Sequence, residues 1–211
     1  EESFASLPLP SVGGGRPLGE KRAMILLHSG IVYPSERDPT QLFEALGRLR
    51  KIGALSPADL RIRFRASVPD DLLQDLAKLH GAQDFIETCG PITYRDALSE
   101  MLVVDALLVL QASNCNAQIP AKIYEYLRAN KPILALTDLA GDTADVMRRA
   151  GLNQIARLDS VDEIAAILPA MVHDWRQGKA RLPDAMAVQQ ASRQGRSKAL
   201  ATLLDQAAGM N

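Results

Sequence analysis

A lysine and a glutamate in the stretch 119–135, IPAKIYEYLRANKPILA, are the strongest chemical signal in this sequence. Proline is favoured in the first turn of a helix, as at Pro120, because its missing N–H would be unpaired there anyway. That turn would present the amides of Ala121 and Lys122, together with the Lys122 ammonium, to a diphosphate. Glu125, on nearly the same helical face, could accept hydrogen bonds from two sugar hydroxyls. An exposed Lys–Glu ion pair within the helix is the ordinary alternative.

A second candidate for binding phosphate lies in the loop after the first apolar run. That run, residues 23–27, is followed by Gly30 and then, seven residues later, by Arg37. Gly30 would let a ligand approach the backbone, and the Arg37 guanidinium can bind an anion through two N–H groups, although a solvated arginine is the ordinary alternative. The sequence contains no GxGxxG and no GxxxxGK[ST], which argues against an NAD domain and a P-loop NTPase.

The histidines and cysteines give little reason to expect acid–base catalysis or a metal site. Cys89 and Cys115 do not form a CxxC pair, so a disulfide scaffold and a structural zinc site are both disfavoured. Burial as small hydrophobic residues is the simpler interpretation of both. His28, at the end of the first apolar run, is more typical of a packed or capping residue than of a catalytic base. No D-x-D magnesium motif is present.

Length and composition suit one folded domain of ordinary size. The 211 residues carry 24 basic and 25 acidic side chains, for a net charge of −1, and 47% of them are hydrophobic. This balance disfavours disorder and a protein that coats nucleic acid. The apolar runs are shorter than the ~20 residues of a membrane helix, and the first residues do not resemble a signal peptide. We therefore expect a reducing, cytoplasmic setting.

Apolar runs alternate with segments of helical periodicity from residue 23 to residue 174. Strands are predicted at 23–27, 60–66, 85–88, 105–110, 132–136 and 154–157, and helices at 41–49, 70–79, 94–101, 121–129, 143–150 and 161–174. Crossover connections of this kind are right-handed and build a parallel sheet that is covered on both faces. The predicted fold is therefore α/β, a Rossmann-like doubly wound parallel sheet. Ligands of such sheets lie outside the carboxyl ends of the strands.

The stretch from Pro120 to Pro132 resembles the P-x-K-x-x-E-Y-x-x-x-x-K-P signature of family 4 (group 1) glycosyltransferases. These are nucleotide-sugar-dependent transferases of the GT-B fold, and the resemblance is strongest to those that act on bacterial surface polysaccharides. It covers residues 23–205, because further segments have the character of the family in the same order: 29–39, 42–46, 90–98, 104–108, 141–145 and 191–193.

The resemblance implies roles for the residues of both candidate loops. Gly30 matches the close-approach glycine, Arg37 the basic residue on the donor pyrophosphate, and Glu125 the second glutamate of a Glu-x7-Glu motif, which holds the ribose hydroxyls. Ala117 stands where that motif has its first glutamate, which departs from the usual contact with the donor sugar. Lys122 is expected to supply a compensating charge, so Arg37, Lys122 and Glu125 are the expected catalytic residues.

The base-binding loop of the family falls at residues 90–94. Pro91, Ile92 and Thr93 match the positions that present backbone groups to the base. Tyr94 either stacks on the base or only opens the following helix. Many relatives carry glycine after the second strand, where this chain has Ala66. No metal and no cofactor are expected, because in this family a helix dipole and basic side chains stabilise the leaving diphosphate.

The resemblance also implies that the chain is one half of a two-domain enzyme. Residues 1–22 would be the remnant of an interdomain linker, 23–190 the donor-binding domain, and 191–211 a C-terminal helix that returns to an absent N-terminal domain. The expected activity is retaining transfer of a sugar from a UDP-, GDP-, ADP- or TDP-sugar to a glycan or lipid-linked acceptor, by a cytoplasmic protein peripheral to the inner face of the membrane. The chain alone is expected to bind the donor and to catalyse poorly.

Two other classes of protein remain as alternatives. A GT-B-fold nucleotide-sugar epimerase would need a complete acid/base set of carboxylates and histidines in these loops, and the sequence offers none. A non-catalytic flavodoxin-like or receiver-like module is the other alternative. A receiver domain needs an acidic pair after its first strand, where this chain has His28 and Ser29.

Overall fold

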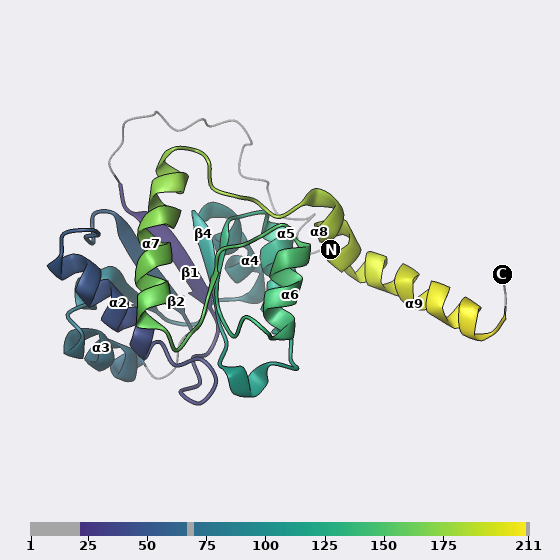
Figure 1. Ribbon diagram of the computed structural model, residues 1–211, viewed down its shortest axis with the longest axis horizontal. Helices are drawn as coiled ribbons and strands as arrows, with labels where there is room; N and C mark the ends of the chain where they lie inside the picture. The colour runs from purple at the N-terminus through teal and green to yellow at the C-terminus, as the bar shows by residue number, and fades with distance from the viewer. Residues whose placement is uncertain (1–21, 67–69, 210–211) are drawn as a thin grey trace.

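The computed structural model describes residues 22–66 and 70–209, so the linker predicted for residues 1–22 lies outside the described residues except for Arg22. In the described part, six strands form one sheet in the order β3-β2-β1-β4-β5-β6, and every pair of neighbours is parallel (Figure 1). The strands are β1 (Met24–Ser29), β2 (Leu60–Arg65), β3 (Ile86–Cys89), β4 (Ala106–Leu110), β5 (Ile133–Leu136) and β6 (Ile155–Ala156).

Helices cover both faces of this sheet. Their bounds are α2 (Thr40–Lys51), α3 (Asp70–Leu79), α4 (Tyr94–Val103), α5 (Lys122–Ala129), α6 (Asp142–Arg149), α7 (Val161–Arg176), α8 (Ala185–Ala191) and α9 (Arg193–Ala207). One hydrophobic core joins α2, α3 and α7 to the sheet, and a second joins α4, α5 and α6 to the opposite face. The predicted Rossmann-like doubly wound sheet is therefore confirmed.

Strand β4 shows why the sequence folds in this way. All five of its residues are buried. Leu108 and Leu110 belong to the core under α2 and α7, whereas Leu107 and Val109 belong to the core under α4 and α5. Because successive side chains of a strand point to opposite faces, a continuous apolar run can occupy only a strand that is covered on both sides.

The winding of the chain reverses between β1 and β4. From β1 the chain proceeds outward through β2 to β3, and from β4 it proceeds outward through β5 to β6. Such a switch point leaves a crevice outside the carboxyl ends of the two central strands. The loops that begin there are residues 30–39, after β1, and residues 111–121, after β4. These are two of the loops that the sequence indicated for ligand binding.

Several boundaries differ from the sequence-based prediction. Phe85 ends a short 3-10 helix (Gln83–Phe85) and does not open β3. Asp105 precedes β4 and does not open it. Its carboxylate accepts a hydrogen bond of 2.9 Å from the Ile25 amide and forms an ion pair with Arg22. Ala66 follows β2 with φ of +57°, a left-handed conformation. The other strand and helix limits up to residue 176 lie within two residues of those predicted.

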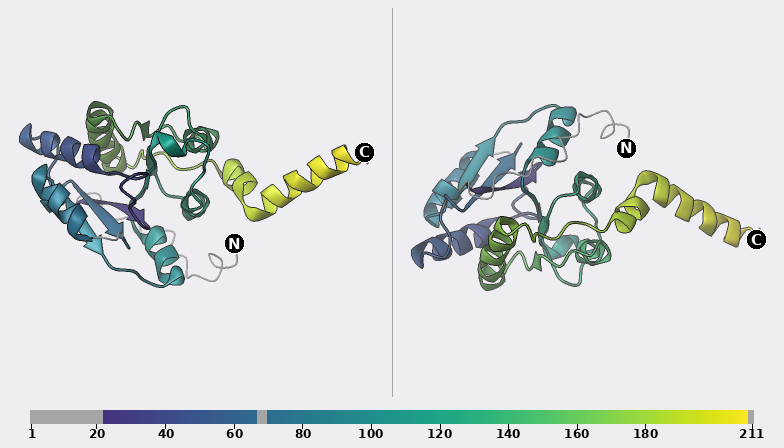
Figure 2. Two further views of the ribbon diagram at one scale, coloured as in Figure 1. Left: turned by 90° about the horizontal axis from the view of Figure 1, so that it is seen from below. Right: turned by 90° about the horizontal axis from the view of Figure 1, so that it is seen from above.

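The C-terminal segment also differs, because the helix predicted to begin at residue 191 begins at Arg193 as α9, and it is preceded by α8, which the sequence analysis did not predict. Ser192 is extended between the two helices, and its hydroxyl accepts a hydrogen bond of 3.0 Å from the Gly195 amide, which caps α9. Val188 and Ala191 of α8 pack against the core under α5. Helix α9 has no buried residue and extends away from the sheet (Figures 1 and 2).

Candidate functional site

The first turn of α5 packs against the carboxyl end of β1 through Lys122 and Gly30. A Cβ atom placed on Gly30 would lie 3.1 Å from Lys122 Nζ, and Gly30 has φ of +120°. The backbone conformation favours glycine at this position, and a side chain here would crowd the lysine amine. The structure thus brings together two residues that lie far apart in the sequence, one from each candidate loop.

His28 contacts the same lysine from within β1. Its ring is fully buried, with Nδ1 3.1 Å from the Leu108 carbonyl oxygen and Nε2 3.4 Å from Lys122 Nζ. A carbonyl oxygen only accepts, so Nδ1 carries the proton and Nε2 accepts from Lys122. Burial, followed by the charges of Lys122 and Arg37, lowers the pKa of His28 well below its ordinary value. The imidazole is therefore neutral at pH 7.

Lys122 is itself electrostatically unusual. Burial, with the nearby charge of Arg37, lowers the pKa of Lys122 to about 7, and the opposing effect of Glu125 is smaller. Within the described residues, neither Lys122 nor Arg37 forms a salt bridge with a carboxylate. Lys122 and Arg37 thus lie near each other without a carboxylate partner among the described residues. An anion bound there would relieve their repulsion.

Arg37 is held in place by its own loop. Its Nη1 donates to the Ile31 carbonyl oxygen at 2.8 Å, and its guanidinium lies 5.2 Å from the centre of the Tyr33 ring. The Ala112 amide donates to the Glu36 carbonyl oxygen at 2.7 Å, which joins this loop to the one after β4. The remaining guanidinium N–H groups are left for another acceptor.

The start of α5 offers backbone donors beside these two cations. The Ile123 amide donates to the Pro120 carbonyl oxygen at 3.0 Å, whereas the amides of Ala121 and Lys122 form no hydrogen bond within residues 22–66 and 70–209. No side chain caps this helix. Free amides at the beginning of a helix, next to cationic side chains, suit a phosphate group. The predicted role of Ala121 is thus geometrically possible.

Tyr126 and Ser29 belong to the same contact, and the sequence analysis did not identify either of them. The buried Tyr126 hydroxyl accepts a hydrogen bond of 3.0 Å from the Ser29 amide, and burial raises the pKa of this phenol. The spacing from Lys122 was the available signal, because residues i and i+4 share a helical face. Three consecutive residues, His28 and Ser29 at the end of β1 and Gly30 directly after it, therefore contact α5.

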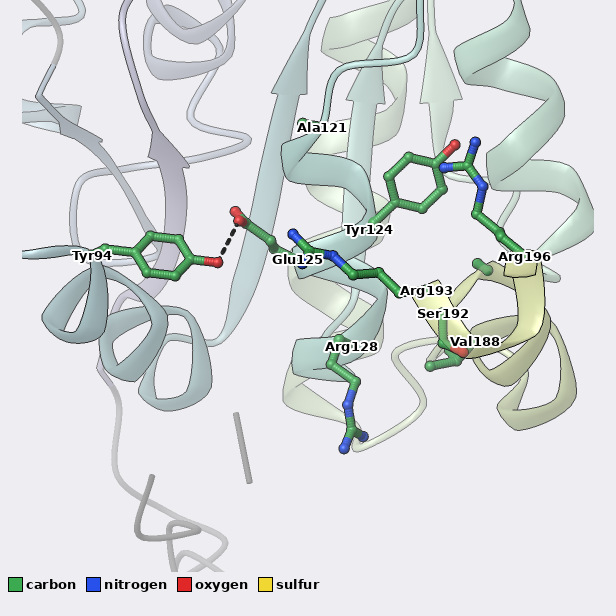
Figure 3. Close-up of a pocket in the computed structure, with 10 residues that line it drawn as sticks. Tyr94, Ala121, Tyr124, Glu125, Arg128, Val188, Ser192, Arg193 and Arg196 are labelled. Atoms are coloured by element: carbon green, nitrogen blue, oxygen red, sulfur yellow. Dashed lines mark hydrogen bonds between the residues drawn. The ribbon is translucent and has the colours of Figure 1, made fainter. Parts of the chain in front are cut away.

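Glu125 lies on the neighbouring face of α5 and is bonded to α4. The Tyr94 hydroxyl donates to Glu125 Oε1 at 2.9 Å (Figure 3). Tyr94 also opens α4, as one of its two predicted roles required, while Thr93 caps that helix by accepting from the Asp96 amide. Burial and the Glu125 carboxylate both raise the pKa of Tyr94.

A cavity of about 320 Å³ extends along α5 beside this pair (Figure 3). It runs between α5, Tyr94 and the start of α9, and Arg196 stacks 4.8 Å from the centre of the Tyr124 ring at its wall. The sequence analysis did not identify its other basic lining residues, Arg128 and Arg193. They come from helices whose packing against each other could not be read from the sequence.

The rest of the predicted base-binding loop is exposed. Pro91, Ile92 and Thr93 connect β3 to α4, and Ile92 is 40% exposed. In the part of the chain that the structure describes, neither Pro91 nor Ile92 hydrogen-bonds to another predicted site residue. The next residue, Tyr94, connects this loop to Glu125 through the hydrogen bond of its hydroxyl. No group of three or more His, Cys, Asp or Glu side chains within the described residues could hold a metal ion.

The fold and the arrangement at the switch point define the class of this domain: it matches one Rossmann-like domain of the GT-B glycosyltransferase fold. Its sequence matches no protein-family model and no curated protein. WaaG, a glycosyltransferase involved in lipopolysaccharide biosynthesis, has a TM-score of 0.57 at 15% identity over 82% of this chain and 44% of that chain.

Two further solved structures show the same likeness. An α,α-trehalose-phosphate synthase (UDP-forming) from Burkholderia xenovorans has a TM-score of 0.57 at 15% identity, over 87% of this chain and 44% of that chain. A Thermobaculum terrenum O-GlcNAc transferase mutant has a TM-score of 0.53 at 18% identity, over 96% of this chain and 38% of that chain. The chain thus spans less than half of each of these proteins, and the likeness establishes the fold. No helix among the described residues could span a membrane.

Proposed function

We propose that this chain is the donor-binding half of a family 4 glycosyltransferase that transfers a sugar from a nucleoside diphosphate sugar to a glycan or lipid-linked acceptor. The observation that carries the proposal is the pair of basic side chains at the switch point. Lys122 and Arg37 converge there without a carboxylate partner, next to the unbonded amides that begin α5. A diphosphate is the group that this combination of charge and donors fits best.

In this proposal, Gly30, Lys122 and Arg37 act together on the diphosphate of the donor. The diphosphate lies over Gly30, where the absence of a side chain lets it approach the backbone. Lys122 and Arg37 stabilise the negative charge that develops on the departing diphosphate, which lowers the barrier to transfer. Because these groups supply positive charge themselves, we propose that no metal is needed.

The nucleoside part of the donor would extend toward α4. Glu125 would accept hydrogen bonds from the ribose hydroxyls, and the backbone of residues 91–93 would face the base, with Tyr94 between the two. The resemblance to family 4 supports retention of the anomeric configuration and a role in bacterial surface polysaccharide synthesis, on the cytoplasmic side of the membrane.

The second half of the enzyme would bind the acceptor. We propose that α9 returns to that half, because Leu200, Leu203 and Leu204 are all more than half exposed and the helix buries none of its residues here. The isolated chain would then bind the donor and transfer its sugar poorly.

The test is calorimetric titration of the chain with UDP, GDP, ADP and TDP. We expect one of them to bind, and we expect Lys122→Ala and Glu125→Ala each to weaken it at least tenfold. Lys78→Ala, on the exposed surface of α3, is the matched control and should leave the affinity unchanged. Binding of none of the four nucleotides, or equal binding by all variants, contradicts the proposal.

A further inference from the structure

We infer that His28 is a positioning residue that holds the Lys122 side chain over Gly30, in the direction of the donor diphosphate. The inference rests on the proposed function, because it concerns the same phosphate site. It assigns a role to a buried histidine that the sequence favoured as a packed or capping residue.

The geometry makes His28 the side-chain partner of the lysine amine. Nε2 of His28 lies 3.4 Å from Lys122 Nζ, and among the described residues no other hydrogen bond of Nζ is formed. Gly30, on the other side, gives the amine its space, at 3.1 Å from a Cβ position. A lysine side chain has four rotatable bonds, so without such a partner it would occupy many conformations.

The imidazole is itself rigidly supported. Its Nδ1 donates to the Leu108 carbonyl oxygen of the neighbouring strand, which fixes the tautomer and aims the Nε2 lone pair at Lys122 of α5. The ring packs 5.7 Å from the ring of Phe64, which in turn meets Phe43 edge-on at 5.9 Å. The His28 imidazole is therefore fixed within the core of the domain. From there it can hold the flexible Lys122 side chain in one position.

A neutral acceptor suits this task better than a carboxylate would. An aspartate or glutamate in the place of His28 would pair with Lys122 and cancel the positive charge that a diphosphate needs. His28 stays neutral because it is buried and faces Lys122 and, from the loop after β1, Arg37. Among the described residues, Glu125 is the carboxylate that raises the pKa of Lys122, and its effect is the smallest of the causes. The lysine is thus held in place by a group that does not neutralise its charge.

Three substitutions of His28 separate positioning from packing. His28→Gln places an amide oxygen where Nε2 lies and should keep the affinity for the nucleoside diphosphate within about threefold. His28→Met has the same length without an acceptor, and His28→Asn keeps only the bond to Leu108. Both should lose about tenfold, the usual worth of a hydrogen bond to a charged group. Affinity for the unphosphorylated nucleoside should not change in any of the three.

A double-mutant cycle completes the test. In a Lys122→Met background, His28→Met should cause no further loss, because the two residues act as one unit. Equal losses in both backgrounds, or equal losses for nucleoside and diphosphate, would show a merely structural role. The proposed function fails separately, and takes this inference with it, when the unmodified chain binds none of the nucleotides. When the unmodified chain binds and His28→Met binds equally well, only the role of His28 is refuted.

Discussion

The Tyr94 hydroxyl donates a hydrogen bond of 2.9 Å to Glu125 Oε1 and so joins the start of α4 to the middle of α5. The two helices otherwise meet through buried apolar residues on the sheet side. The bond fixes the orientation of a carboxylate that faces solvent on its other side. In the proposed function, this bond would orient Glu125 toward a sugar hydroxyl, at the cost of one of its acceptor positions.

Tyr94→Phe should reduce the preference for ribonucleotides. The phenyl ring keeps its packing, but the Glu125 carboxylate loses the donor that orients it, so its hydrogen bonds to the ribose should weaken by about 1 kcal/mol, or about fivefold in affinity. The ratio of affinities for the ribonucleotide and its 2′-deoxy form, measured by calorimetry, reports this loss. Ser99→Ala, which removes only a hydrogen bond to the Arg95 carbonyl oxygen within α4, is the control. An unchanged ratio would mean that Tyr94 does not act through Glu125.

Binding of the nucleoside diphosphate should weaken as the pH rises above 7. The pKa of Lys122 is lowered to about 7 in the free protein, and a bound diphosphate favours the ammonium form, so above pH 7 the complex must take up a proton. Affinity should then fall about tenfold per pH unit between pH 7 and 9. Calorimetry in buffers of different ionisation enthalpy measures the proton uptake directly.

Lys122→Arg is the matched control for this pH dependence. A guanidinium stays charged throughout that range, so its complex should show neither the decline nor the proton uptake. If the unmodified chain and Lys122→Arg lose affinity in parallel, another group is responsible for the pH dependence.

Lys122→Met should stabilise the folded protein at pH 6 while it weakens nucleotide binding about tenfold. The folded-state pKa of Lys122, about 7, lies below its ordinary value of 10.5. The unfolded chain therefore binds more protons than the folded one in this interval, and the free energy of unfolding rises with pH from about 7 to about 10.5. Below pH 7 the whole penalty for the charged lysine is present.

Removal of that charge should raise Tm at pH 6 by about 2–4 °C, which corresponds to about 1 kcal/mol for a chain of this size. The gain should shrink as the pH approaches 10, because the unmodified protein is then relieved of the same penalty. Lys78→Met, on the solvent-exposed side of α3, should show no such pH-dependent gain. A binding-site lysine that destabilises the fold is the usual sign of a group retained for its function.

Periodicity in the sequence was enough to predict the sheet and most of its helices. Continuous apolar runs such as that of β4 can be buried only between two helical layers, and the loop glycine and the Pro-x-Lys turn indicate where a ligand binds. The contact between His28 and Lys122 could not be predicted, because it depends on how closely α5 packs against β1. Helix α8 was missed for a similar reason: it is short, and its packing against the core beside α5 is visible only in the structure.

Ala66→Gly should stabilise the protein, because Ala66 has φ of +57° after β2. The left-handed conformation costs an L-residue with a Cβ about 1–2 kcal/mol, whereas glycine adopts it without strain. The Ala66 amide donates to the Cys89 carbonyl oxygen at 2.8 Å, which holds the turn in place. Glycine also has the greater backbone entropy in the unfolded chain, which offsets part of this gain. The free energy of unfolding, measured by urea denaturation, should therefore rise by about 0.5–1 kcal/mol. Ala97→Gly, within α4, should instead destabilise by about 0.5–1 kcal/mol. A loss of stability in Ala66→Gly would show that this turn does not require a residue that tolerates positive φ.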